Sequence, residues 1–156
     1  MTEGHRRPRV LFLCTGNACR SQMAEGWATH LHADVIEASS AGTEPHGVHP
    51  LAIRVMWEAD VDISTHESTS LDEIDVTSLD VVITVCAHAH ESCPVLPSGV
   101  TVVHHGFDDP PRLAIDARTD EEAMVHFRRV RDDIRAFVET LPEVVAGAMR
   151  SKGGAQ

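Results

Sequence analysis

Residues 14–21, CTGNACRS, follow directly on the apolar run VLFL at 10–13. A short buried strand, a compact loop and an amphipathic stretch over 21–31 predict a strand, loop and helix unit. In such a unit the loop amides and the helix N-terminus point toward one spot, which favours a tetrahedral oxyanion. The pattern therefore predicts a local fold and an anion site at the end of a strand.

Two side chains of this loop add chemistry to the anion site. Arg20 supplies a planar, permanently charged fork for two oxygens, and Cys14 lies at the mouth, where the positive field stabilises its thiolate. Gly16 suits a tight turn, Asn17 tolerates a left-handed backbone, and Ser21 can hydrogen-bond the thiolate. We expect the oxyanion to be bound by Thr15, Gly16, Asn17, Ala18, Cys19, Arg20 and Ser21.

Two other interpretations of the loop are weaker. A free cysteine is often only a core residue, but packing alone does not require a glycine and an arginine at these spacings. A nucleotide-binding P-loop needs the pattern GxxxxGK[ST], and the single lysine of the chain, Lys152, is far away in sequence.

Composition restricts the domain count, the partners and the compartment. With 156 residues, of which 42% are hydrophobic, we expect one domain over 1–156, ordered over about 8–146, with a disordered tail at 150–156. The net charge of −11 argues against nucleic acid and repels small anions at long range. No apolar run could span a bilayer and no secretory signal pattern is present. We expect a cytoplasmic monomer whose four cysteines are catalytic or metal-bound.

The predicted elements alternate along the chain. Strands are expected over 9–14, 35–40, 79–85 and 100–103, and helices over 21–31, from Pro50 and from Thr119. The side chains expected to face the core from the later two helices are Ile53, Met56, Trp57, Ala123, Phe127, Val130, Ile134, Phe137 and Leu141. This order predicts a doubly wound α/β domain with a four-stranded parallel sheet, and chemistry at the carboxyl edge of that sheet.

Two further cysteines, Cys86 and Cys93, enclose the sequence AHAHES after the third predicted strand. If the segment is helical, the two residues lie about 10 Å apart along the axis, whereas a disulfide needs Cα atoms about 6 Å apart. A disulfide would therefore require unwinding, which makes the segment a candidate redox switch. The alternative is a zinc site made with His88 and His90, but the spacing matches no common zinc template.

The remaining candidates are a thiol and an acid. Cys19 is expected to point into the core while its amide serves the oxyanion. Asp108 and Asp109 follow the last strand in GFDDP, and a carboxylic acid there could protonate a departing oxygen. We favour Asp109, because Pro110 fixes the backbone directly after it; the alternative is that the pair only makes a polar turn.

These residues resemble a known family, the thioredoxin-coupled arsenate reductases, which have the low-molecular-weight protein tyrosine phosphatase fold. The likeness covers most of the chain: CTGNACRSQMAEGW at 14–27, SAGTEPHGVHP at 40–50, VDISTHES at 61–68, TVC and CPVLP around Cys86 and Cys93, and GFDDP at 106–110.

The resemblance implies an arsenate-detoxifying oxidoreductase that has no tightly bound cofactor and takes its electrons from thioredoxin. Cys14 would attack arsenate, which Arg20 binds, with Asp109 as the acid, and phosphate or sulfate would compete for the site. Cys86 would then attack Cys14 as arsenite leaves, and Cys93 would attack Cys86. The resulting Cys86–Cys93 disulfide would be reduced by thioredoxin.

Two departures from the family pattern concern the loop and a potassium site. Ala18 stands where serine is usual. Thr69 stands where some members have an aspartate that helps to bind potassium, while Asn17, Glu25 and Ser40 match the other positions of that site. The resemblance therefore implies at most a weak potassium site at these three residues.

Two other functions use the same residues. A phosphomonoester hydrolase of the low-molecular-weight tyrosine phosphatase type, possessing the same Cys14, Arg20 and Asp109, would need no further thiol. Against it, Pro111 and Arg112 follow the Asp-Pro pair where aromatic residues would hold a phosphotyrosine ring. An arsenite or metal sensor is the third class, but no basic DNA-binding helix pair is visible.

Overall fold

The computed structural model describes residues 6–154, with side chains as far as residue 150. The chain forms a single α/β domain around a four-stranded parallel sheet in the order β2-β1-β3-β4. The strands are β1 (Arg9–Cys14), β2 (Glu37–Gly42), β3 (Val81–Thr84) and β4 (Thr101–His104). The predicted fold class is confirmed, and the central strands β1 and β3 consist almost wholly of buried residues, as expected for strands covered on both faces.

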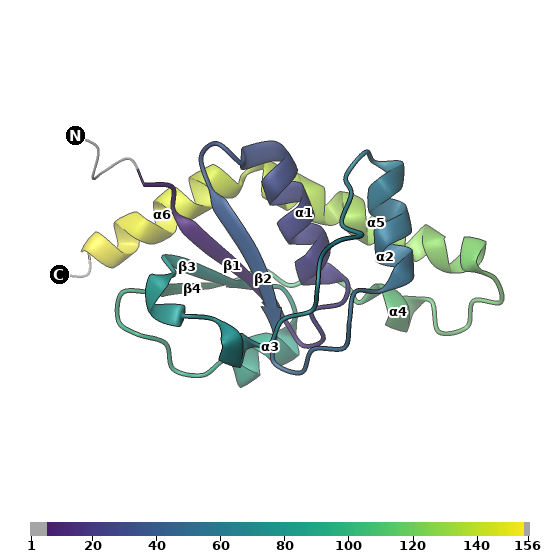
Figure 1. Cartoon of the computed structure of the whole chain (residues 1–156), viewed down its shortest axis with the longest axis horizontal. Helices are drawn as coiled ribbons and strands as arrows, with labels where there is room; N and C mark the ends of the chain where they lie inside the picture. The colour runs from purple at the N-terminus through teal and green to yellow at the C-terminus, as the bar shows by residue number, and fades with distance from the viewer. Residues whose placement is uncertain (1–5, 155–156) are drawn as a thin grey trace.

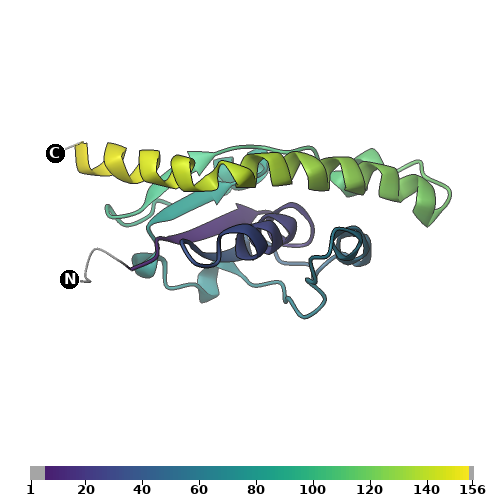
Figure 2. The same ribbon diagram turned by 90° about the horizontal axis from the view of Figure 1, so that it is seen from above.

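Helices flank this sheet (Figure 1). They are α1 (Arg20–His32), α2 (Pro50–Glu58), α3 (Ala87–Ser92), α4 (Pro110–Leu113), α5 (Asp120–Glu139) and α6 (Leu141–Gly154), with 3₁₀ turns η2 (Leu71–Glu73) and η3 (Val76–Ser78). Helix α1 packs on β1 and β2, and α6 packs on β3 and β4. Figure 2 shows α5 and α6 following one another along the length of the molecule.

Local signals account for the helix starts. Thr119 caps α5 by accepting a hydrogen bond from the Glu122 amide at 3.1 Å, as its sequence predicts.

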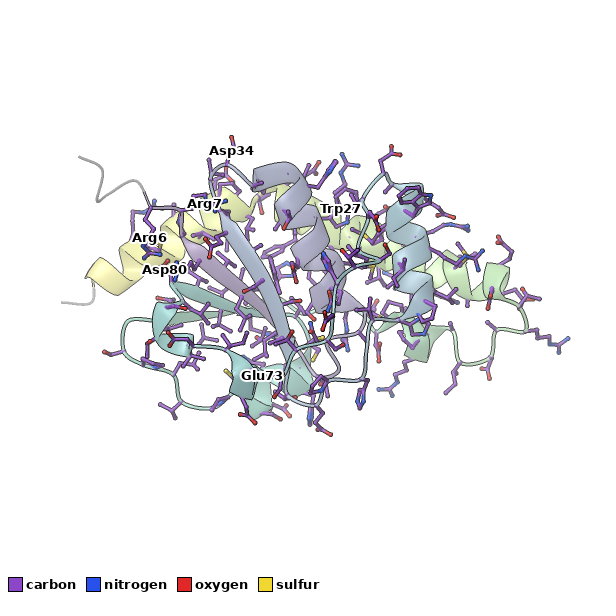
Figure 3. All side chains as sticks on the ribbon, in the orientation of Figure 1. Arg6, Arg7, Trp27, Asp34, Glu73 and Asp80 are labelled. Atoms are coloured by element: carbon purple, nitrogen blue, oxygen red, sulfur yellow. The ribbon has the colours of Figure 1, made fainter. Side chains whose placement is uncertain are left out.

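Trp27 of α1 is buried and its indole nitrogen donates to the Arg131 carbonyl of α5 at 3.1 Å, so these helices are joined by a polar contact within the core. Figure 3 labels Trp27 beside α1.

Two strands begin later than predicted because neighbouring turns use their amides. Strand β2 starts at Glu37, since the amides of Val35 and Ile36 both donate to the His32 carbonyl at the end of α1. Strand β3 starts at Val81, since the Leu79 amide closes the turn η3 on the Val76 carbonyl. Both corrections are local and leave the carboxyl ends of the strands nearly where they were expected.

Trp57 is a correction to the predicted core: its side chain is 66% exposed. Met56, its neighbour on α2, is fully buried, and successive helical residues point about 100° apart. The short helix therefore cannot turn both side chains inward. Phe137 is only partly buried, whereas Leu141 is buried but belongs to α6, because α5 already ends at Glu139.

Helix α6 reaches into the segment at 150–156, whose predicted disorder stays a prediction. Helix α6 continues to Gly154, and residues 155 and 156 lie outside the described residues. Ala148 and Met149 pack against the core, and once a turn is anchored, each further helical residue adds one hydrogen bond at little cost.

An ion pair lies at the edge of the sheet opposite the predicted site. Arg6 makes two hydrogen bonds of 3.1 Å to Asp80, and the Asp80 carboxylate also accepts from the Arg9 amide at 2.8 Å. Figure 3 shows this pair where β1 and β3 begin.

Within residues 6–154, none of the helices combines the length and the apolar character that crossing a bilayer requires.

Candidate active site

The anion loop joins the end of β1 at Cys14 to the start of α1 at Arg20. A strap of residues 43–49 runs beside it and binds its carbonyls. The amides of Thr43, Glu44, His46 and His49 donate to the carbonyls of Cys14, Thr15, Gly16 and Ala18 at 3.2, 2.8, 2.9 and 3.0 Å. Because the strap occupies the carbonyl side of the loop, the opposite, amide side is available to form an anion-binding concavity.

Asn17 is the structural centre of the loop. Its backbone is left-handed, with φ of 47°, as the sequence predicts, and its side chain is fully buried. Its side-chain oxygen accepts from the Thr69 amide at 2.8 Å, and its carbonyl accepts from Ser68 and Gln22. The bonds from Ser68 and Thr69 hold the loop against a segment that follows it by 51 and 52 residues.

A hydrogen-bond chain leads from Asn17 to the candidate nucleophile. The Asn17 amide group donates to Ser21 Oγ at 2.8 Å, and Ser21 Oγ lies 2.9 Å from Cys14 Sγ. Because Ser21 Oγ accepts from Asn17, its own hydrogen can be directed at the sulfur. The arrangement supports the predicted role of Ser21 as a donor to the Cys14 thiolate.

A cavity of about 260 Å³ opens on Cys14. It is lined by Cys14, Thr15, Gly16, Ala18, Cys19, Arg20, His46, Asp109 and Pro111. Most of the predicted anion-binding residues line this cavity, while Asn17 and Ser21 support the loop from behind it. His46 was missed by sequence reasoning, because it lies neither in the loop nor at a strand end.

Arg20 and Asp109 meet across this cavity. The Arg20 guanidinium lies 3.8 Å from the Asp109 carboxylate and donates to the Phe107 carbonyl at 3.1 Å. Asp108 instead points away and pairs with Arg129 of α5 at 2.8 Å. Of the two aspartates, only Asp109 lines the cavity, which favours it as the candidate acid.

Cys19 is a poor candidate nucleophile. Its side chain is 5% exposed, and burial, followed by the nearby Asp109 charge, raises the pKa of its thiol well above the usual range. A buried thiol of this kind stays protonated at neutral pH and is inert. The structure agrees with the expectation that Cys19 packs in the core.

The sheet brings Cys86 next to the anion loop. Strands β1 and β3 are neighbours, and Cys86 Sγ lies 3.4 Å from Thr15 Oγ1, one residue after Cys14. Cys86 is buried and caps helix α3, where its sulfur accepts from the Ala89 amide at 3.3 Å. Cys93 lies partly buried at the other end of α3, and burial raises the pKa of its thiol.

Two candidate metal sites come from the sequence, a zinc alternative near Cys86 and a weak potassium site near Ser40. Among residues 6–154 no three His, Cys, Asp or Glu side chains converge as metal ligands would, so the zinc alternative gains no support. Ser40 donates to Glu25 at 2.6 Å beside a cavity of about 390 Å³, whereas the side-chain oxygen of Asn17 is bound to Thr69. Potassium binding there stays a prediction.

Gly42 is a second residue that sequence reasoning missed. A Cβ atom at this position would lie 2.7 Å from the Thr15 carbonyl oxygen and 2.9 Å from the Asn17 nitrogen. The end of β2 therefore approaches the anion loop more closely than any other residue type allows. Its only signal in the sequence was a glycine at the end of a predicted strand.

Comparison with known proteins identifies the family of this fold and loop. Residues 9–149 match the low molecular weight phosphotyrosine protein phosphatase family. The chain belongs to this phosphatase family. Within it, the chain is 46% identical to an arsenate reductase of Halalkalibacterium halodurans over 134 residues, which are 86% of this chain and 94% of the relative.

Solved structures resemble the chain over most of its length. An arsenate reductase in the phosphate-binding state is 33% identical, with a TM-score of 0.70, and the match covers 90% of this chain and 98% of that one. A thioredoxin-dependent arsenate reductase of Corynebacterium glutamicum is 26% identical, with a TM-score of 0.67, over 91% of this chain and 63% of that one. A low molecular weight protein tyrosine phosphatase from T. tengcongensis, 25% identical, has a TM-score of 0.67 over 87% of this chain and 98% of that one.

Proposed function

We propose that this protein is a cytoplasmic arsenate reductase in which Cys14, Cys86 and Cys93 pass electrons from thioredoxin to arsenate. The observation that carries the proposal is the 3.4 Å contact between Cys86 Sγ and Thr15 Oγ1, which brings a second thiol to the loop of the first. Hydrolysis of a phosphate ester needs one thiol, whereas reduction needs a second thiol within reach of the first. The arsenate reductase relatives support the same choice.

The reaction begins with arsenate bound by the loop amides and Arg20. The Cys14 thiolate attacks arsenic(V), an As–S bond forms, and a hydroxyl group leaves as water after taking a proton from Asp109. The Ser21 hydroxyl, which accepts a hydrogen bond from Asn17, can donate one to the attacking sulfur. Pairing of Asp108 with Arg129 leaves Asp109 as the acid nearest to Arg20.

The relay then moves two electrons to arsenic. The Cys86 thiolate attacks Cys14 Sγ, so that an S–S bond forms as the As–S bond breaks, and its electron pair leaves with arsenic as arsenite. The Cys93 thiolate next attacks Cys86 Sγ and releases the Cys14 thiolate. Thioredoxin finally reduces the Cys86–Cys93 disulfide through its own dithiol, which becomes oxidised.

Helix α3 must unwind for the last internal step. Cys86 and Cys93 flank the six residues of this helix and would be about 10 Å apart along a helical axis. Their Cα atoms must approach to about 6 Å in a disulfide. Only Ala89 of the helix is buried, so few contacts oppose the opening. Unwinding would also expose Cys93 to water and make its thiolate easier to form.

Phosphate ester hydrolysis is the second candidate function. The pairing of Arg20 with Asp109 beside Cys14 favours it, because these three residues suffice for that reaction. Pro111 lines the cavity mouth where an aromatic side chain could hold a phosphotyrosine ring. We therefore expect slow hydrolysis of small esters only.

The deciding assay measures arsenite formed from arsenate with thioredoxin, thioredoxin reductase and NADPH, beside cleavage of a chromogenic phosphate ester. Cys14→Ser should abolish both activities, because a hydroxyl is a far poorer nucleophile at neutral pH. Cys86→Ser and Cys93→Ser should abolish repeated turnover with thioredoxin and leave ester cleavage intact.

Cys19→Ala is the matched control, since it removes the one thiol outside the relay. It should keep both activities once the variant is shown to be folded. Continued thioredoxin-dependent cycling of Cys86→Ser or Cys93→Ser would refute the relay. Ester cleavage without arsenite formation in the unmodified protein would refute the reductase and favour a phosphatase.

A further inference from the structure

The cavity holds one permanent cation, and that cation already faces a carboxylate. Arg20 lies 3.8 Å from Asp109, so part of its charge is compensated before any ligand arrives. The chain also carries a net charge of −11, which repels anions at long range. Binding of a tetrahedral dianion would be much improved by a second positive charge at the cavity wall.

His46 is the residue positioned to supply that charge. It lines the cavity, and its backbone amide donates to the Gly16 carbonyl at 2.9 Å. Its ring covers Gly16 so closely that a Cβ atom on Gly16 would lie 2.8 Å from His46 Cδ2. Main chain and ring are thus both held against the anion loop, while the side chain remains exposed to water and can take up a proton.

We propose that His46, in its imidazolium form, binds an oxygen of the oxyanion together with Arg20 and makes oxyanion affinity depend on pH. The inference rests on the proposed function, because it takes the ligand of the loop to be a tetrahedral oxyanion. An imidazolium gains a donor and a charge on protonation, so it binds a dianion more strongly than the neutral ring does.

The effects of other charged groups near the strap must be distinguished from the effect of His46. Glu44 carries the nearest acidic side chain on the strap, and it lies 3.7 Å from His88 Nε2 on α3. His49 packs on Phe127, and burial lowers the pKa of its ring. The groups that share the cavity are Arg20, Asp109, Cys19 and Cys14, and a thiolate at Cys14 would repel the ligand.

The test uses inorganic sulfate, which stays a dianion throughout the pH range of histidine titration. Binding is measured by calorimetry in a Cys14→Ser background, which removes the thiolate from the pH profile. Adding His46→Gln should weaken sulfate binding about tenfold near pH 6, as expected for loss of one charged hydrogen bond. The difference should disappear near pH 8.5, because the proposed contact needs the imidazolium form.

His88→Gln in the same background is the matched control and should keep the parental profile, because His88 pairs with Glu44 outside the cavity. Equal sulfate affinity of the parent and His46→Gln at both pH values would overturn the proposal. An equal loss at both pH values would also overturn it, since that result indicates a packing role without charge.

Arsenate turnover gives a second readout in the protein with Cys14 intact. His46→Gln should raise KM for arsenate about tenfold near pH 6 and leave kcat nearly unchanged, because the residue acts in binding. The proposed reductase function and the proposed role of His46 can be refuted independently of each other. Absence of arsenate reduction in the unmodified protein refutes the reductase, while the sulfate arm still decides the role of His46.

Discussion

Replacing Gly42 by alanine tests whether the position of the anion loop depends on backbone contact with the end of β2. The added Cβ would lie 2.7 Å from the Thr15 carbonyl oxygen, 2.9 Å from the Asn17 nitrogen and 3.0 Å from Asn17 Cβ. An ordinary carbon–oxygen contact is about 3.3 Å, so the loop must move by roughly 0.6 Å. All three obstructing atoms belong to the loop, which cannot yield by a simple side-chain rotation.

The expected cost has two parts. Overpacking of this kind destabilises a protein by about 1–3 kcal/mol, which urea unfolding can measure. Displacement of catalytic groups by about 1 Å lowers rates by about 10²-fold, so a shift of 0.6 Å should reduce arsenate turnover by about 10- to 100-fold. Sulfate affinity should fall as well, because the anion is proposed to bind the amides of this same loop.

Gly99→Ala is the matched control for this experiment. A Cβ at Gly99 meets no atom within 4 Å, so the substitution changes the same chemical group without a clash. It should leave turnover and sulfate binding unaltered. If Gly42→Ala keeps the unmodified stability and oxyanion affinity, the close approach of β2 does not position the loop and our reasoning is wrong.

Three further predictions concern the acid, pH and the redox helix. Asp109→Asn should slow ester cleavage about 10²- to 10⁴-fold with little loss of sulfate affinity, whereas Asp108→Asn should not; the reverse ranking would identify the other aspartate as the acid. Burial lowers the pKa of His49, whose Nδ1 accepts from the Leu51 amide in its neutral form. The unfolded chain therefore binds a proton at this position more readily than the folded protein does. The free energy of unfolding should fall as pH drops through about 6.5, and it should fall less steeply in His49→Asn. Equal slopes of unfolding free energy against pH in the two proteins would contradict this. Oxidation to the Cys86–Cys93 disulfide should reduce the hydrogen-exchange protection of the residues between these cysteines, while β3 stays protected. Unchanged protection, together with normal reduction by thioredoxin, would rule out unwinding.

The local part of the site could be predicted from the sequence because neighbouring residues determine it. The apolar run before Cys14 forms β1 with the predicted bounds, and Asn17 has the left-handed backbone that its side chain tolerates. Thr119 caps α5 as expected. Such features depend on backbone preferences and on contacts within about four residues, which are visible in any short stretch of sequence.

Tertiary structure alone decided how distant segments meet at the loop. The strap bonds to the loop carbonyls, Gly42 approaches Thr15, and His46 covers Gly16. Packing also turns Asp108 toward Arg129 and Asp109 toward Arg20, although the two aspartates are adjacent in sequence. The sequence by itself determined the parallel sheet and singled out the candidate nucleophile and its loop. The remaining partners follow from the packing of whole elements, which no local pattern of residues specifies.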